Sequence, residues 1–143
     1  MHSPILAPVV ALVAWSLVMM LWMVSTRLPA MKRKGIDLKG LVGGRGADLD
    51  GVIEREVQWK SHNYNHLMEQ PTLFYAICLS LALMEMGGGL NLILAWVYVG
   101  LRIVHSLVQA PTNVVRIRFT FFALASFVLV ALTLHAGMAL LHG

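Results

Sequence analysis

One stretch of the sequence carries most of the side chains that could do chemistry. Residues 54–70 read E-R-E-V-Q-W-K-S-H-N-Y-N-H-L-M-E-Q, whereas residues 72–86 read T-L-F-Y-A-I-C-L-S-L-A-L-M-E-M. The first part is densely polar, the second is almost wholly apolar, and no turn signal separates them. The pattern predicts one long helix that begins outside a membrane and ends inside it.

The polar part of this helix is ordered around its axis. At 100° per residue, its polar side chains share a sector less than a third of a turn wide: Arg55, Gln58, His62, Asn65 and Glu69, with His66 at the edge. A charge in hydrocarbon costs roughly 3 kcal/mol or more. We therefore expect the face near Glu69 to contact other helices, a water-filled cavity or a polar ligand.

Two later segments bring polar residues to the same depth: Arg102, His105 and Gln109 in the third helix, and Arg116 and Arg118 in the fourth. Ionisable groups within membrane segments mark functional sites by default. One alternative is that Glu69 pairs with Arg102 or Arg118 merely to hold the helices together. Because the cations outnumber this one glutamate, we expect the arginines to bind an anionic ligand with carboxylates.

Other kinds of site are less well supported. His62 and His66 are four residues apart and Glu69 follows, but the neighbouring arginines oppose a bound cation, so we expect no metal. No Ser-His-Asp triad is visible, since Ser61 and Ser106 lack an elbow motif. What remains is an enzyme whose nucleophile arrives with the substrate, such as a thiol held beside arginines.

The composition identifies the class of protein. The chain has 143 residues, 58% hydrophobic and 13% charged, and its mean hydropathy is +0.73. A soluble protein of this size could not bury so much apolar surface, so we expect an integral membrane protein with one domain over residues 1–143. The net charge of +4 is not arranged as a basic face with aromatics, so we expect no nucleic-acid partner.

The fold class predicted is all-α, an integral membrane four-helix bundle. The expected helices are about 5–26, 53–86, 90–109 and 113–141. A glycine-rich loop is expected from Leu28 to Gly51, Asp50 and Asn113 are expected as helix N-caps, and Pro71 is expected to kink the second helix. Three glycines, Gly87 to Gly89, are expected to make the turn that follows.

The basic residues predict the orientation. With four spans, all eleven Lys and Arg fall in one pair of loops or in the adjoining helix halves. Positive residues remain on the cytoplasmic side, so we expect a multi-pass protein with both termini outside and its site on the cytoplasmic side.

Two motifs carry a family resemblance. The run N-H-L-M-E-Q-P-T-L-F from Asn65 to Phe74 resembles the second-helix signature of the MAPEG family, the membrane-associated proteins in eicosanoid and glutathione metabolism. The run L-R-I-V-H-S-L-V-Q from Leu101 to Gln109, followed by R-I-R from Arg116 to Arg118, resembles the family's third-helix R-x-x-H motif and the arginine after it. Nearly the whole chain is covered, and it is similar to bacterial-type relatives of microsomal glutathione transferases.

The resemblance implies a homotrimer with glutathione between neighbouring subunits near the cytosolic side, and lipophilic substrates that arrive from the membrane lipid. By position, Glu69 would hold the glutathione amine, Arg118 would stabilise the thiolate, and Arg102 and His105 match the family's third-helix pair. Arg27 matches a glutathione-contacting arginine. The other expected glutathione-binding residues are Arg55, His62, Asn65, His66 and Arg116.

Some positions depart from the family pattern. His62 and Asn65 stand where many members have arginine, Gln109 where the synthase branch has tyrosine, and Phe119 where that branch has serine. These changes argue against prostaglandin or leukotriene synthesis. The expected function is a membrane-bound glutathione-dependent transferase or peroxidase for lipophilic substrates, and the alternative is a non-catalytic lipid-binding scaffold of the same fold.

Overall fold

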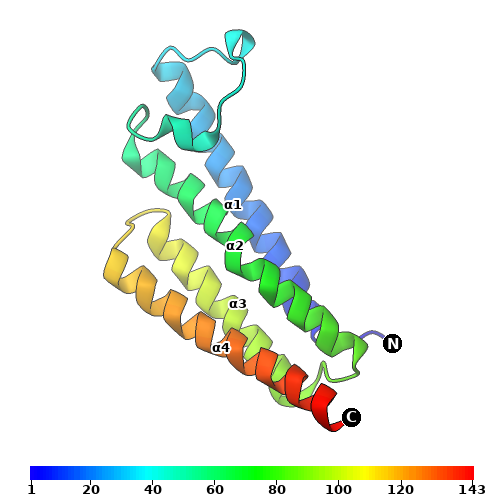
Figure 1. Cartoon of the computed structure of the whole chain (residues 1–143). Coiled ribbons are helices and arrows are strands. Elements are labelled where there is room, and N and C mark those ends of the chain that lie inside the picture. Colours follow the sequence, from blue (N-terminus) through cyan, green and yellow to red (C-terminus); the bar gives the residue numbers. More distant parts are fainter.

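The computed structural model describes all 143 residues and contains only helices. The long helices are α1 (Leu6–Arg33), α2 (Arg55–Leu83), α3 (Gly89–Gln109) and α4 (Val115–His142). Two short 3₁₀ helices, η1 (Leu38–Gly40) and η2 (Gly46–Leu49), lie in the α1–α2 loop. The four long helices run side by side, with both chain termini at one end and the α1–α2 loop at the other (Figure 1). The all-α, four-helix prediction is confirmed.

Three of the four helices, α1, α3 and α4, are long and apolar enough to cross a membrane. The N-terminal half of α2 is too polar to qualify by composition, yet this helix has 29 residues and packs along α1, α3 and α4. It therefore crosses the bilayer with them and brings its polar half to the membrane surface. The chain is a multi-pass integral membrane protein.

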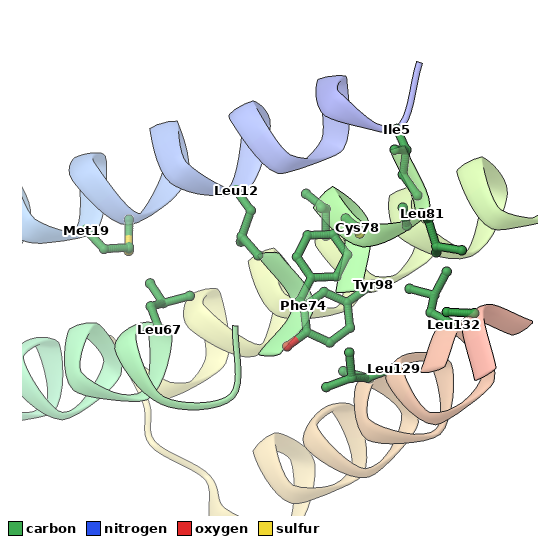
Figure 2. Close-up of a cluster of buried hydrophobic side chains, with 14 residues drawn as sticks. Ile5, Leu12, Met19, Leu67, Phe74, Cys78, Leu81, Tyr98, Leu129 and Leu132 are labelled. Atoms are coloured by element: carbon green, nitrogen blue, oxygen red, sulfur yellow. The ribbon is translucent and has the colours of Figure 1, made fainter. Parts of the chain in front are cut away.

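The apolar core joins all four helices (Figure 2). Its centre is the pair Phe74 and Tyr98, whose stacked rings lie 4.3 Å apart between centroids. Leu12 packs on them from α1 and Leu129 from α4. From Asn63 to Leu81 the buried residues of α2 recur every three or four positions, as expected for one helix face turned to the core.

A chain of hydrogen bonds crosses this apolar core. The Tyr98 hydroxyl donates to Gln70 Oε1 at 3.0 Å, and Gln70 Nε2 donates to Ser126 Oγ at 2.7 Å. Polar groups buried in a membrane protein need such partners, because lipid offers none. These hydrogen bonds fix the positions of α2, α3 and α4 relative to one another, next to the polar half of α2.

The first helix is longer than predicted. It continues past Leu28 and through Pro29 to Arg33, where a loop was expected. A proline removes one backbone donor, which packing can offset. Here Ala30 and Met31 are buried against Ile53, at the end of the loop, so tertiary contacts stabilise the extra turns. In the same way α2 continues through Pro71.

Both predicted N-caps are wrong. Glu54 and Val114 occupy those positions, and neither makes a side-chain capping bond. Asp50 lies four residues before Glu54 and uses its carboxylate in another contact, described below. Asn113 instead adopts a left-handed conformation with φ of 51°, which asparagine tolerates better than most residues.

The turn between α2 and α3 also differs from the expectation. The second helix ends at Leu83, and Glu85 takes the left-handed conformation with φ of 59°. Gly87 is needed for a different reason, namely its close approach to the N-terminal segment. A Cβ at this position would meet Ser3 Oγ and would lie 2.8 Å from Ile5 Cγ2.

Candidate functional site

Arg102 is the most deeply buried cation of the chain. It lies on the face of α3 that turns into the bundle, and only 1% of it is exposed. Its Nη2 donates to the backbone oxygen of His66 at 2.9 Å. Its Nε and Nη1 are buried and have no hydrogen-bond partner within the chain. A buried charged donor without a partner is costly, so a water molecule or a ligand that reached these two groups would stabilise the protein.

A pocket of about 200 Å³ is lined in part by His66, whose backbone oxygen accepts from Arg102, but Arg102 itself is not part of the lining. Its polar lining consists of His66, His105 and Arg118, and its apolar lining consists of Val115, Phe119 and Phe122. The rings of His66 and His105 lie 5.9 Å apart between centroids. Three helices thus supply a small cavity whose lining combines one arginine, two imidazole rings and two phenyl rings.

His105 contributes an acceptor to this pocket. Its Nε2 lies 2.8 Å from Gln109 Oε1. An amide oxygen can only accept, so Nε2 carries the hydrogen and Nδ1 is the unprotonated nitrogen of the neutral ring. Nδ1 is buried and has no partner. His105, which lines the pocket, therefore has one acceptor that no group of this chain uses.

Glu69 does not pair with an arginine. Its Oε2 lies 3.3 Å from His66 Nδ1, and 65% of its side chain is exposed. The alternative in which Glu69 pairs with Arg102 or Arg118 to hold the bundle together is therefore wrong. Glu69 lies nine residues beyond Lys60 on α2, about 13.5 Å further into the bilayer. A carboxylate exposed at that depth requires a partner from outside this chain.

A second polar group lies nearer the α1–α2 loop and includes Arg27. Arg27 Nη2 donates to Gln58 Oε1 at 3.2 Å and also to Ser61 Oγ. Gln58 in turn donates through Nε2 to Asp50 Oδ1 at 2.6 Å and to the backbone oxygen of Gly46 at 3.2 Å. These bonds hold the loop against α1 and α2.

Asp50 is the anionic centre of this second group. The amide of Gln58 donates to it, and His62 Nε2 lies 3.1 Å from the same oxygen. These contacts, with the Gln58 bond first, lower the pKa of Asp50 below its ordinary value of 3.8. Arg55 joins Asp50 and His62 in the lining of a separate hollow of about 230 Å³.

The structure therefore divides the predicted site residues. His66, Arg102, His105 and Arg118 come together, whereas Arg27, Arg55 and His62 belong to the loop end. His62 and His66 have different carboxylate partners, and no group of three metal-binding side chains is present. Asn65 and Arg116 are exposed on the surface of the chain.

A comparison with protein-family models identifies the family to which this chain belongs. The model described as the MAPEG family matches residues 5–138. The chain belongs to the MAPEG family. Comparisons with curated proteins and with solved structures gave no match. The match covers nearly all of the chain, including every residue of the pocket, and relates this membrane protein to glutathione or eicosanoid metabolism.

Sequence reasoning missed part of the polar framework of this MAPEG chain. Asp50 was expected only as a helix cap, and Ser61 was considered only as a nucleophile. Gln58 was placed on the polar face of α2 as a candidate for a ligand or a helix contact, and the structure shows it 3% exposed between Arg27 and Asp50 of the loop. The sequence did contain one signal for this contact, namely the spacing of four residues between Gln58 and His62. Side chains four residues apart lie on the same side of a helix and can reach the same partner.

Proposed function

We propose that the protein is a membrane-bound glutathione-dependent transferase or peroxidase that acts on lipophilic substrates. The observation that carries the proposal is the buried guanidinium of Arg102, which has two unpartnered donors and is bonded to the backbone oxygen of His66, a residue of the Arg118 pocket. A chain that only packs helices together has no need of a buried cation without a counterion. A ligand with carboxylates supplies the missing acceptors.

The donor set fits glutathione, a tripeptide with two carboxylates, one amine and one thiol. Arg102 and Arg116 would bind carboxylates, and Glu69 would bind the amine through its exposed oxygens. Glutathione supplies the nucleophilic thiol when it is bound. Arg118 would place a positive charge beside that thiol and favour its ionised form. Neutral His105 would accept a hydrogen bond from the ligand at Nδ1.

The same surface supports a homotrimer with its site between subunits. Asn65, Glu69 and Arg116 are exposed in a single chain, and lipid cannot satisfy Glu69 at its depth. A neighbouring copy would cover this side of α2 and complete the binding site. Native mass spectrometry from a mild detergent should show three copies, and a stable monomer would contradict an intersubunit site.

The lipophilic substrate would enter from the bilayer. Phe119 is 65% exposed on α4 and also lines the pocket, so one aromatic side chain faces both the lipid and the site. The end of the bundle that carries the basic residues would face the cytoplasm, with both termini outside. Glutathione would then enter from the cytosol and the second substrate from the membrane.

Binding and ionisation of glutathione test the proposal directly. Calorimetry on the detergent-purified protein should detect glutathione at millimolar concentration or below. The bound thiol should absorb in the ultraviolet as a thiolate near neutral pH. Arg118→Ala should lose this absorbance and most of the turnover while retaining much of the binding. Glu69→Gln should weaken binding first, because it removes the charge that faces the amine.

The control is Arg33→Ala, which removes an exposed cation at the loop end that lies 3.7 Å from Glu54. It should leave both binding and absorbance unchanged. If Arg118→Ala does not alter absorbance or turnover, the arginine is structural. If the wild type binds no glutathione at millimolar concentration, the protein is a lipid-binding scaffold of the same fold and the proposal fails.

A further inference from the structure

Two histidines line the proposed glutathione pocket, and the side chains that they face differ. His105 faces an amide, since its Nε2 lies 2.8 Å from Gln109 Oε1. His66 faces a carboxylate, since its Nδ1 lies 3.3 Å from Glu69 Oε2. An ionised acceptor stabilises a charged donor more strongly than a neutral acceptor does. Of the two rings, His66 is therefore the one placed to carry an added proton.

The contact with Glu69 also decides which nitrogen of His66 is the acceptor. Glu69 follows His66 by three residues, and side chains at this spacing are neighbours on a helix surface. An ionised carboxylate only accepts hydrogen bonds, so the hydrogen of the neutral imidazole belongs on Nδ1. The lone pair of the ring is then on Nε2. A nucleophile, a base beside it and a third group that orients the base are the recurring parts of nucleophilic catalysis.

Glu69 can serve both His66 and the glutathione amine. His66 lines the pocket together with Arg118, whereas Glu69 is outside the lining. One carboxylate oxygen of Glu69 faces the imidazole, and 65% of the side chain is exposed. The second oxygen is thus free for the amine. Towards the thiol in the pocket, Glu69 acts through His66.

The remaining titratable and charged groups that face His66 come from α3 and α4. Arg102 donates to the backbone oxygen of His66 at 2.9 Å, and the His105 ring lies 5.9 Å away between centroids. Arg118 shares the pocket lining, to which α1 contributes no residue. Glu69 is the acidic member of this group. A proton gained by His66 would therefore lie between two negative charges, the carboxylate of Glu69 and the new thiolate.

We propose that His66 accepts the proton of the glutathione thiol at Nε2, with Glu69 as the residue that positions its ring. The S–H bond breaks, its electron pair stays on sulfur beside Arg118, and the proton forms an N–H bond on His66. When the thiolate then displaces a leaving group from an electrophile, a sulfur–carbon bond forms. The electron pair of the broken bond departs with the leaving group, and the imidazolium returns its proton to that group or to water. This inference rests on the proposed glutathione chemistry of the pocket.

The test counts the protons that the full chain releases when it binds glutathione at neutral pH. Calorimetry in buffers of different ionisation enthalpy gives this count, and S-methylglutathione, which carries no thiol proton, supplies the value to subtract. Ultraviolet absorbance gives the amount of thiolate formed. The wild type should release far fewer protons than it forms thiolates, because His66 keeps the thiol proton. His66→Gln, whose amide cannot take up a proton, should release one proton for each thiolate that it still forms.

The matched control is His62→Gln, which removes the other histidine of α2 that faces a carboxylate, 3.1 Å from Asp50 and outside the pocket lining. It should keep the proton count of the wild type. At saturating glutathione, Glu69→Gln should raise the count towards that of His66→Gln, because the imidazolium loses its anionic partner.

The wild-type protein alone can overturn the inference. If it releases one proton for each thiolate, His66 is not the acceptor, although the glutathione-dependent function stands. An equal rise in the proton count for His62→Gln and His66→Gln would also contradict the role of His66. If the wild type binds no glutathione, or binds it without forming a thiolate, the inference fails; in the first case the proposed function fails with it.

Discussion

Arg102 and His66 are joined by a hydrogen bond from the guanidinium to the backbone oxygen, across 2.9 Å. This bond links the buried face of α3 to the polar half of α2, where the proposed pocket begins. It satisfies one nitrogen of the guanidinium and leaves Nε and Nη1 unpartnered. The buried charge is therefore a cost in the free protein that a ligand can offset.

Arg102→Met should keep the thermal stability of the free protein but lose its binding of glutathione. Buried ionic groups can often be replaced by well-packed apolar side chains of similar volume without loss of stability, and a buried cation without a counterion carries an uncompensated desolvation cost. We expect the melting temperature of the free protein to be unchanged or higher. The rise in melting temperature on addition of glutathione should be lost. Thermal melts with and without glutathione measure the melting temperature of the free protein and its rise with ligand. Arg33→Gln is the control. If Arg102→Met keeps the rise in melting temperature with glutathione, Arg102 does not bind the ligand.

Asp50→Asn should reduce acid sensitivity. The pKa of Asp50 is lowered in the folded state, first by the Gln58 hydrogen bond, so its stabilising contribution is present above about pH 4. That contribution is lost as the pH falls below 4 toward the folded-state pKa. As the pH falls through this range, the melting temperature of the wild type should therefore decrease more steeply than that of Asp50→Asn. Gln58→Met, which removes the main donor, should also flatten the profile, and identical slopes in all three proteins would contradict the assignment.

Tyr98→Phe should destabilise the bundle. The change removes the donor to Gln70 Oε1 and leaves that oxygen in a low-dielectric interior. Hydrogen bonds between membrane helices contribute about 0.6 kcal/mol on average and up to roughly 1.7 kcal/mol. Tyr75→Phe is the matched control, because the Tyr75 hydroxyl is buried without a partner. Unfolding in mixed detergent should show a loss for Tyr98→Phe and little or none for Tyr75→Phe.

Gly87→Ala should loosen the turn between α2 and α3. A methyl group at this position would lie 2.8 Å from Ile5 Cγ2, and overpacking of this kind costs about 1–3 kcal/mol. Gly88→Ala offers the comparison, since a Cβ there meets nothing within 4 Å. Thermal melting should separate the two variants. Equal melting temperatures would show that the N-terminal segment does not pack on the turn.

The orientation can be measured with fusions. A reporter that is active only outside the cytoplasm should work after Gly143, whereas a cytoplasmic reporter should work when inserted near Gly44. The physical reason is the restriction of all eleven Lys and Arg to one end of the bundle. The reverse pattern would place the proposed site on the opposite side of the membrane.

Several features of this protein could be predicted from the sequence because they depend on local pattern. Long apolar runs fix the number and approximate bounds of the helices, since each must cover the bilayer. The face shared by Tyr98, Arg102, His105 and Gln109 follows from helical periodicity, and all four residues are buried. The two short motifs around Glu69 and Arg102 led to the family, which the family model confirms.

Other features depend on which segments meet in three dimensions. Pro29 lies inside α1 because Ala30 and Met31 pack on Ile53, more than 20 residues later. Asp50 serves the loop network rather than the helix start, because Gln58 and His62 reach it from α2. Helical periodicity places side chains on a face but does not say which neighbour covers it. Only the packed structure could show that Gln58 is buried by the loop while Glu69, on nearly the same face, remains exposed.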